Sequence, residues 1–227
     1  MSYKKIGIVV ADKDEYEPFV NSVKVNKVAT PFKSAAMFLC GGTEVIAVLC
    51  GIGKVNAAAA AMYLVSSGCD LILNFGLSGG LNNAGRGEYV LPCRFIEHDF
   101  DLTVLGYKPF EKPRQTYIYE ADKTISEKIA KAGIADIGGT AVSGDRFISS
   151  NADRDFLIET LSAQSCDMET AAIASVCSIT NIPFVSLRRI SDDASDTAVD
   201  SYDDMNKKEG LSLSDTFISC LKIICEA

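Results

Sequence analysis

Carboxylates are the side chains in this sequence that are best suited to catalysis. Asp12 and Glu15 follow the first apolar run, Glu169 precedes an alanine-rich stretch, and Asp192 follows a pair of arginines. The chain contains one histidine, His98, so a zinc site built from several imidazoles is excluded, and a Ser-His-Asp triad would depend on that residue alone. Several carboxylates beside an arginine, without metal ligands, favour acid-assisted cleavage of a glycosidic bond.

Each of these carboxylates also has a purely structural interpretation. Asp12 and Glu15 have the spacing of a helix capping box, in which Asp12 would close the first turn. Asp192 follows two arginines, so an ion pair within a loop is its simpler role. The segment Gly51-Ile52-Gly53-Lys54 is an incomplete phosphate-binding motif, and its glycines favour a tight turn from a strand into a helix.

The elements that must position these residues alternate between strands and helices. Apolar runs rich in Val, Ile and Leu predict buried strands at about 5–10, 44–50, 70–75, 88–96, 138–142 and 183–188. Helices are predicted over 54–67, 123–131, 167–180 and 211–225, and another is expected to begin after Asp12. The alternation predicts an α/β sandwich, in which ligands bind beyond the carboxyl ends of the strands. The carboxylates and glycine turns are therefore expected to converge on one pocket.

Composition limits the other classes of function. The 227 residues carry a formal net charge of −8, which disfavours binding to nucleic acid or to an anionic membrane and favours a small-molecule substrate. The eight cysteines are scattered without a Cys-x-x-Cys pair and are interpreted as reduced thiols in the core. The first apolar run ends at Asp12, too early for a signal peptide, so we expect a cytoplasmic protein with a single domain over residues 1–227.

Beyond these patterns, a series of motifs resembles the 5′-methylthioadenosine/S-adenosylhomocysteine nucleosidases, within the purine nucleoside phosphorylase-like superfamily. The resemblance runs from Ile6 to about Met205. It rests on Ile6-Gly7-Ile8 with Glu15, Gly51-Ile52-Gly53-Lys54-Val55, Gly79-Gly80-Leu81, His98-Asp99-Phe100-Asp101 with Gly106-Tyr107, Ser143-Gly144-Asp145-Arg146-Phe147-Ile148, Met168-Glu169, Pro183-Phe184-Val185 and Arg188-Arg189-Ile190-Ser191-Asp192. It implies a three-layer sandwich with a central mixed, twisted β-sheet flanked by helices, and a reaction that uses neither a metal nor a cofactor.

The resemblance also implies a reaction and a role for each site residue. The reaction is hydrolysis of the N-glycosidic bond of 6-aminopurine nucleosides, with release of adenine. Asp192, oriented by Ser191, would protonate N7 of the purine, while Glu15 would activate water with Arg188 close by. The other implied contacts to substrate are Ile52, Ser78, Phe147, Ile148, Met168, Glu169 and Tyr202, together with Leu102, Leu105, Tyr107 and Pro113 in a segment that reaches across a homodimer interface to the C5′ substituent.

The sequence departs from the usual family pattern around the C5′ substituent and the water. Five positions differ, where the family usually has Met, Ser, Phe, Glu and Phe: Asp12, Leu77, Leu105, Asp167 and Tyr202. The added carboxylate and phenol predict a more polar pocket for the substituent. Leu77 has no hydroxyl, and the adjacent Ser78 would serve in its place only after a shift of the loop. The preferred substituent is left open among the thioethers, 5′-deoxyadenosine, adenosine and aminofutalosine-type nucleosides.

Two other functions are compatible with the same residues. A purine nucleoside phosphorylase would need to hold a phosphate dianion, which the three carboxylates and single lysine of residues 12–15 disfavour. A nucleoside-binding homologue without catalysis would have no need of an acid and a water activator. The presence of Glu15, Glu169 and Asp192 together therefore favours the hydrolase.

Overall fold

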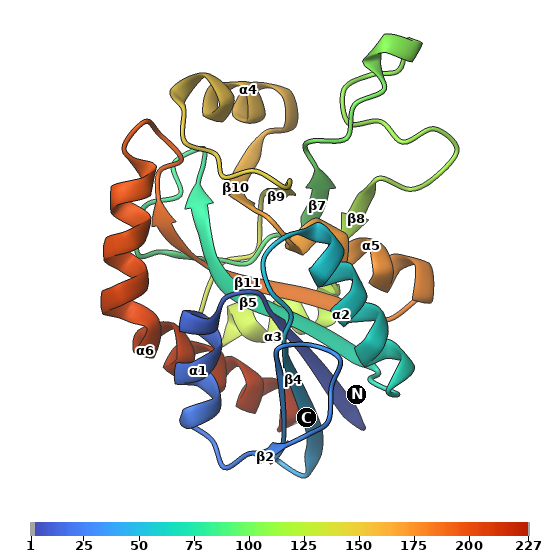
Figure 1. The fold of residues 1–227 in the computed structure, drawn as a ribbon, viewed down its shortest axis with the longest axis vertical. Helices are drawn as coiled ribbons and strands as arrows, with labels where there is room; N and C mark the ends of the chain where they lie inside the picture. Colours follow the sequence, from blue (N-terminus) through green and yellow to red (C-terminus); the bar gives the residue numbers. More distant parts are fainter. Residues whose placement is uncertain (1–2, 227) are drawn as a thin grey trace.

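A mixed β-sheet forms the centre of the molecule. In the computed structural model, which describes residues 3–226, 11 strands join in one sheet. Their order is β2-β3-β4-β1-β5-β10-β9-β7-β8, with β11 paired to β5 and β6 paired to β11. Helices lie on both faces of this twisted sheet, as Figure 1 shows, so the predicted sandwich with a central mixed sheet is confirmed.

The strands and helices have the following bounds. The strands are β1 (Lys5–Val10), β2 (Asn26–Lys27), β3 (Ser34–Cys40), β4 (Thr43–Leu49), β5 (Leu71–Gly80), β6 (Tyr89–Val90), β7 (Arg94–Glu97), β8 (Ile118–Glu120), β9 (Thr140–Ser143), β10 (Ala163–Asp167) and β11 (Phe184–Asp192). The helices are α1 (Lys13–Asn21), α2 (Lys54–Ser66), α3 (Lys123–Lys131), α4 (Asn151–Leu161), α5 (Thr170–Thr180) and α6 (Ala198–Cys225), with a 3-10 turn η1 (Thr103–Leu105).

Most of the predicted elements are confirmed, and the exceptions are informative. The predicted strand 88–96 is two short strands, β6 and β7, and α6 begins at Ala198 instead of residue 211. The strands β2, β3, β8 and β10 and the helix α4 were not predicted. β10 has the sequence Ala-Gln-Ser-Cys-Asp, whose small and polar side chains lack the apolar alternation that marks a strand.

The helices on the two faces of the sheet pack against it with different side chains. On one face, α1 and α6 pack through Phe19 and Phe217 against Phe75 of β5, and the rings of Phe75 and Phe217 stack with centroids 4.0 Å apart. On the other face, α2 buries alanines, which let the helix approach the strands closely. A Cβ at Gly7 of β1 would lie 2.7 Å from a side-chain atom of Ile72, so glycine is required for this packing.

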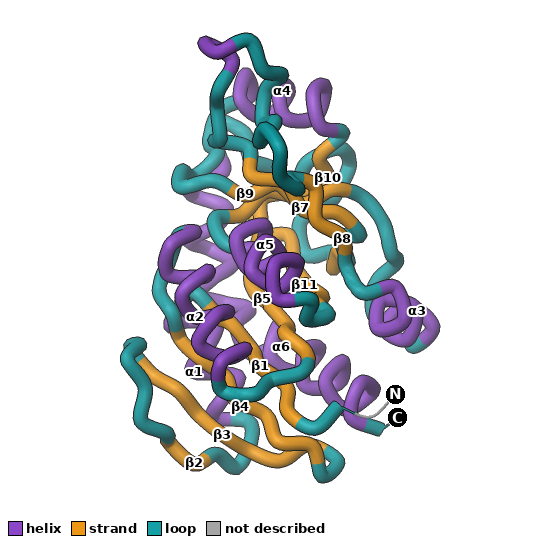
Figure 2. Tube along the Cα trace, turned by 90° about the vertical axis from the view of Figure 1, so that its right-hand side faces the viewer, coloured by secondary structure: helices purple, strands orange, loops and turns teal. Residues whose placement is uncertain are grey.

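The long strands β5 and β11 connect the two halves of the sheet. Both run in parallel, with Ser186 beside Asn74 and Arg188 beside Gly76, and β1 pairs with the other edge of β5. In the side view of Figure 2 they extend from β1 toward the upper strands β7, β9 and β10. Their carboxyl ends therefore place residues from distant parts of the chain around one point. Within residues 3–226, no helix is long and apolar enough to cross a membrane.

Candidate active site

One pocket lies where β1, β5, β10 and β11 end. It contains all four of the predicted catalytic residues and seven of the predicted substrate contacts. The lining residues are Ala11, Asp12, Glu15, Ile52, Leu77, Ser78, Gly79, Arg146, Phe147, Ile148, Cys166, Asp167, Met168, Glu169, Arg188, Ser191, Asp192 and Tyr202. The prediction that several strand ends converge on one pocket is confirmed.

The first turn of α1 separates the roles of its two carboxylates. Asp12 is the N-cap residue, and its Oδ1 accepts a hydrogen bond of 2.7 Å from the backbone N of Asp14. Glu15 does not complete a capping box, because its Oε1 accepts a 2.7 Å hydrogen bond from the backbone N of Leu77 on β5. Burial raises the pKa of Glu15 to about 8, although Arg188 and the Leu77 hydrogen bond both oppose this shift. Glu15 is therefore a carboxyl group that can exchange a proton near neutral pH.

Arg188 lies at the centre of the pocket and is buried. Its Nε donates to Ser78 Oγ at 2.8 Å and its Nη1 to Asn74 Oδ1 at 3.2 Å, while its Nη2 donates to the carbonyl of Leu77. Its Nε also lies 3.6 Å from Asp167 Oδ2. The guanidinium is thus held on several sides, in one orientation.

The backbone of β5 connects Arg188 to Glu15. Leu77 donates its N–H to Glu15 and its carbonyl accepts from Arg188, so the missing serine hydroxyl at this position leaves both contacts intact. A Cβ at Gly76 would lie 2.7 Å from Glu15 Oε2 and 2.8 Å from Arg188 Nη1. Gly76 thus allows both charged groups to lie directly over the strand. Ser78, which lies within β5, lines the pocket and accepts a hydrogen bond from Arg188.

Glu169 enters the pocket from the start of α5. Its Oε1 accepts a 2.8 Å hydrogen bond from the backbone N of Gly53, in the turn that leads into α2. Burial, followed by the charge of Asp167, raises the pKa of Glu169 to about 7. The turn of residues 51–54, which has an incomplete phosphate-binding motif, therefore donates its amide to a carboxylate of the protein itself.

The predicted helix start at residues 167–169 was wrong, because Asp167 is the last residue of β10. From there its Oδ1 accepts hydrogen bonds of 3.0 Å from the backbone N of both Glu169 and Thr170, at the N-terminus of α5. Ser143 Oγ donates to the same oxygen at 2.6 Å. A carboxylate outside the helix thus satisfies its first N–H groups, as an N-cap residue would.

Asp192 ends β11 and is buried. Its Oδ2 accepts a 2.7 Å hydrogen bond from Ser191 Oγ, and its Oδ1 accepts one of 2.9 Å from the backbone N of Ala194. Burial raises the pKa of Asp192, against the lowering effect of the Ser191 hydrogen bond. The two arginines that precede it in the sequence donate elsewhere, Arg188 to Ser78 and Asn74 and Arg189 to the carbonyl of Gly87. The charge of Arg86 lowers the pKa of Asp192 against the effect of burial.

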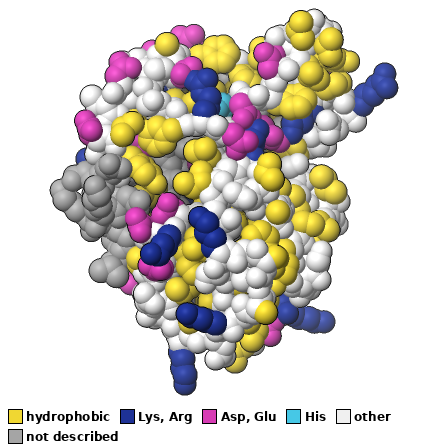
Figure 3. Space-filling model, in the orientation of Figure 1, with side chains coloured by type: hydrophobic (Ala, Val, Ile, Leu, Met, Phe, Trp, Pro, Cys, Tyr) yellow, Lys and Arg dark blue, Asp and Glu magenta, His cyan; other side chains and the backbone are white. Residues whose placement is uncertain are grey.

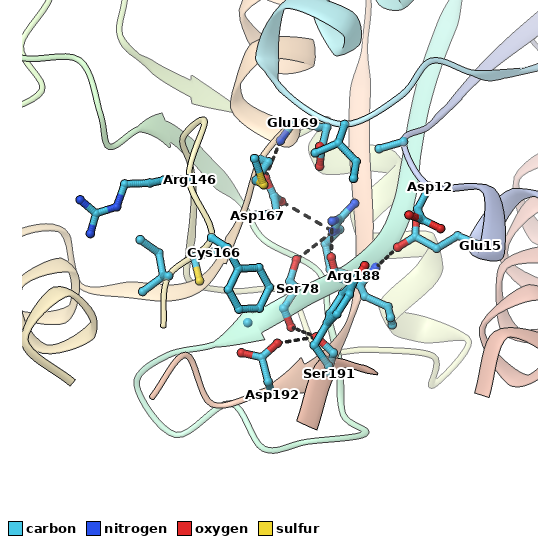
Figure 4. A pocket seen from close by; sticks show the side chains of 18 residues that line it. Asp12, Glu15, Ser78, Arg146, Cys166, Asp167, Glu169, Arg188, Ser191 and Asp192 are labelled. Carbon is cyan, nitrogen blue, oxygen red and sulfur yellow. Dashed lines mark hydrogen bonds and ion pairs between the residues drawn. The ribbon is translucent and has the colours of Figure 1, made fainter. Parts of the chain in front are cut away.

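Aromatic side chains form another wall of the pocket. The rings of Phe147 and Tyr202 meet edge to face with centroids 5.6 Å apart, and both line the pocket together with Ile52. Arg146, also at the pocket, forms an ion pair with Asp153 of α4. Figure 4 shows its guanidinium directed away from Arg188 and the carboxylates. The wall is suited to an aromatic base.

The four remaining predicted contacts lie outside this pocket, in the segment between β7 and β8. We name residues 98–117 the 98–117 loop; Leu102, Leu105, Tyr107 and Pro113 belong to it. Leu105 is 68% exposed and Tyr107 37%. The loop projects from the upper part of the molecule in Figure 1. Its base is held by Lys54 of α2, whose Nζ lies 3.1 Å from Glu97 and also contacts Asp99.

Sequence reasoning missed the buried polar residues behind the pocket. Asn74, Ser143 and Thr170 contact Arg188 or Asp167 but do not line the pocket. One signal was present for Asn74, which interrupts an apolar strand and must therefore find hydrogen-bond partners. Ser143 and Thr170 have no comparable signal, because serine and threonine are common at the ends of strands and helices.

The sequence matches a family model and known proteins over nearly its whole length. The family model of the phosphorylase superfamily matches residues 5–221. The 5′-methylthioadenosine/S-adenosylhomocysteine nucleosidase of Shewanella piezotolerans is 32% identical over 230 residues, covering 96% of this chain and 99% of the relative. The nucleosidase of the same name from Staphylococcus aureus is 29% identical over 219 residues, covering 93% of this chain and 96% of the relative.

A solved structure has the same fold. The 5′-methylthioadenosine/S-adenosylhomocysteine nucleosidase from Neisseria meningitidis, in complex with methylthio-immucillin-A, matches with a TM-score of 0.89 and 28% identity, covering 96% of this chain and 99% of that one. The likeness thus extends over nearly the whole length of both proteins. The chain belongs to the phosphorylase superfamily and, within it, to the 5′-methylthioadenosine/S-adenosylhomocysteine nucleosidases.

Proposed function

We propose that this protein hydrolyses the N-glycosidic bond of 6-aminopurine nucleosides that are modified at C5′, and that it releases adenine. The arrangement of three buried acids around one arginine is the observation that carries this proposal. Figure 4 shows Glu15, Glu169 and Asp192 at separate points of the pocket, on either side of Arg188. Such an arrangement allows one group to donate a proton and another to accept one in the same reaction.

Asp192 is the general acid of the proposed reaction. As the bond between C1′ and the base breaks, its electron pair moves to the base, and a proton from Asp192 to N7 makes the departing adenine neutral. Burial raises the pKa of Asp192, which favours the protonated form that this step requires. Ser191 and Ala194 hold the carboxyl group through hydrogen bonds of 2.7 and 2.9 Å.

Glu15 accepts the proton of the attacking water. The water oxygen forms the new bond to C1′, and its proton passes to the Glu15 carboxylate, so that the free ribose with its C5′ substituent is the second product. A base whose pKa is about 8 suits this role near neutral pH. Arg188, which shares the space over Gly76 with Glu15, is placed to orient the water.

Glu169 binds the ribose in this scheme. Its carboxylate accepts hydrogen bonds from the sugar hydroxyls and stabilises the positive charge of an oxocarbenium-like transition state. Its second partner, the Gly53 N–H at 2.8 Å, fixes the carboxylate against the turn before α2. Phe147 stacks on the purine, and Met168 packs beneath the sugar.

Water is a better nucleophile in this pocket than phosphate. Asp12, Glu15, Asp167 and Glu169 all line it, and the guanidinium of Arg188 is already occupied by protein acceptors. A phosphate dianion would have to displace those acceptors and approach the carboxylates of Asp12 and Asp167, as well as any ionised fraction of Glu15 and Glu169. This charge distribution supports hydrolysis over phosphorolysis.

Adenine release with and without phosphate tests the proposal. We expect 5′-methylthioadenosine to yield adenine and free methylthioribose at the same rate in both conditions, as measured by ultraviolet absorbance and by mass spectrometry of the sugar. An absolute requirement for phosphate with formation of a sugar 1-phosphate would identify a phosphorylase. Tight nucleoside binding without turnover would identify a non-catalytic homologue.

The C5′ region is proposed to accept polar substituents. Asp12 and Tyr202 line the pocket, where the family usually has methionine and phenylalanine. One oxygen of Asp12 caps α1, and the other is free to accept a hydrogen bond from a ligand. We therefore expect adenosine, whose 5′ hydroxyl is a donor, to be cleaved alongside 5′-methylthioadenosine. Adenosine analogues that differ only at C5′ rank these substituents by kcat/KM.

The proposal includes a homodimer whose partner subunit covers the C5′ substituent with its 98–117 loop. Val104 in this loop is 91% exposed and Val55 at the start of α2 is 80% exposed. Figure 3 shows hydrophobic side chains gathered on the projecting loop and further down the same side of the molecule. Exposed apolar side chains of this extent mark an interaction surface.

A further inference from the structure

Asn74 and Thr170 form a buried polar pair directly behind the pocket. Both side chains are almost fully buried, and neither lines the pocket. Asn74 lies within the apolar strand β5, and Thr170 is the first residue of α5. Because burial of a polar side chain is unfavourable without hydrogen bonds, their partners indicate why they are present.

The amide of Asn74 is oriented by its neighbours on both sides. Its Nδ2 donates to the carbonyl of Val9 on β1 at 3.0 Å. Its Oδ1 accepts from Ser186 Oγ at 2.9 Å, from Thr170 Oγ1 at 3.0 Å and from Arg188 Nη1 at 3.2 Å. The opposite orientation would place the NH₂ group against the N–H of Arg188 and the amide oxygen against the carbonyl of Val9. Aspartate would place a second oxygen against the Val9 carbonyl, so an amide of this length is required.

Thr170 connects Asn74 to the second partner of the arginine. Its hydroxyl lies between Asn74 Oδ1 and Asp167 Oδ2, and it is within hydrogen-bond distance of both. Asp167 Oδ2 in turn lies 3.6 Å from Arg188 Nε. Asn74 therefore accepts a hydrogen bond from Nη1, and Asp167 forms an ion pair beside Nε, whose hydrogen bond goes to Ser78. Thr170 lies between Asn74 and Asp167.

The position of the guanidinium matters to the acids that face it. Arg188 Nη1 and both carboxyl oxygens of Glu15 lie over Gly76. The positive charge of Arg188 lowers the pKa of Glu15 and that of Glu169, against the larger effect of burial. A guanidinium that moved away would favour ionisation of these groups less strongly.

We propose that Asn74 and Thr170 are positioning residues, which from outside the pocket hold the Arg188 guanidinium over Gly76, where it faces Glu15. This inference rests on the proposed function for what Arg188 and Glu15 do in catalysis. The way in which the guanidinium is held is inferred from the hydrogen bonds alone. The two parts are tested by different measurements.

The kinetic test is Thr170→Val, which keeps the shape of the side chain and removes its hydroxyl. We expect kcat for 5′-methylthioadenosine to fall by about 10- to 100-fold, with a change in KM below about threefold. The rise of kcat/KM with pH should move to higher pH, because Glu15 ionises less readily. Thr170→Ser, which keeps the hydroxyl, should restore both values.

A matched control is Ser126→Ala in α3, which also removes a buried hydroxyl, one that donates to the carbonyl of Asp122 at 2.8 Å. It should leave kcat and the pH profile unchanged. If Thr170→Val does not fold, Thr170→Ala removes the same hydroxyl without adding volume. Normal kcat with an unmoved pH profile in the folded variant would overturn the proposal. A loss of activity that is fully explained by a smaller amount of folded protein would also overturn it.

A second measurement does not require turnover. The carboxyl carbon of Glu15 can be titrated by ¹³C NMR in the nucleoside-free protein and in the Thr170 variants. We expect the midpoint, at about 8 in the natural protein, to rise in Thr170→Val and to return in Thr170→Ser. A midpoint that is unchanged in Thr170→Val overturns the positioning role, even if the protein proves to have no nucleosidase activity. Absence of turnover with the expected NMR shift overturns only the proposed function.

Discussion

The floor of the pocket, which we define as Glu15, Arg188 and Asp192, and the 98–117 loop differ in how far a single chain supplies their packing and hydrogen-bond partners. On the floor, Glu15, Arg188 and Asp192 each have protein hydrogen-bond partners and are buried. In the loop, Leu105 and Val104 are exposed at 68% and 91%. Buried charges must be held by fixed partners, whereas exposed apolar side chains gain by being covered. The comparison supports the proposal that one chain supplies the groups for bond cleavage, whereas the proposed contact to the C5′ substituent needs a second copy.

The largest expected effect is on the floor, at the general acid. Asp192→Asn keeps the shape of the side chain but has no acidic proton, so kcat should fall by about 10³-fold or more. Nucleoside binding, measured by calorimetry with 5′-methylthioadenosine, should change little. Turnover within a few fold of the natural protein would rule out Asp192 as the acid.

The next largest effect on kcat is expected at Glu15, the proposed base for the attacking water. Glu15→Gln can still accept the hydrogen bond from Leu77 but cannot take a proton, so kcat should fall by about 10²-fold or more. Adenine release is the measurement, and Asp12→Asn, which alters the neighbouring cap, is the comparison variant. A mild loss in Glu15→Gln, equal to that in Asp12→Asn, would limit Glu15 to a structural role.

A moderate effect is expected in the loop. Leu105→Asp places a charge in the proposed interface, so the particle mass should shift from dimer toward monomer and KM should rise by about tenfold. Light scattering and steady-state kinetics measure the two changes. Leu39→Asp is the matched control, because Leu39 is 73% exposed on β3, and it should alter neither value. An unchanged mass and KM in Leu105→Asp would make the loop independent of assembly.

The smallest effect concerns stability. The pKa of Glu15 is raised from 4.5 to about 8 on folding, so its ionisation destabilises the folded state as the pH rises through this window. Glu15→Gln removes this cost and should stabilise the protein by about 1–3 kcal/mol at pH 9, with no gain below pH 4. Thermal unfolding at both pH values measures the difference. A gain that is equal at the two values would have another cause than ionisation.

Much of the fold follows from local patterns. β1, β4 and α3 were predicted within a residue or so, since continuous apolar runs and helix-forming segments mark them directly. β10 was not predicted, because it is held by its pairing with β9 and β5 and not by an apolar pattern of its own. The start of α5 was also misplaced. The carboxylates at residues 167 and 169 suggest a helix N-terminus, whereas residue 167 belongs to β10.

The sequence by itself determined which groups are available and the order in which they follow the strands. Residue type and position made Asp192 and Glu15 candidates for catalysis, alongside a structural interpretation of each as a loop ion pair or part of a helix cap. The resemblance of the motifs then predicted their association with a nucleoside. These are properties of short segments, which the chain carries in any conformation.

Only the tertiary structure decided what each carboxylate does. Asp12 and Glu15 both suit a helix cap by spacing, and it is the N–H of Leu77, 62 residues away, that draws Glu15 into the pocket. Asn74 contacts Arg188, 114 residues away, and Thr170, 96 residues away. Burial then raises the pKa of Glu15 to about 8. Hydrogen bonds and desolvation depend on which distant segments meet, and no local pattern specifies that.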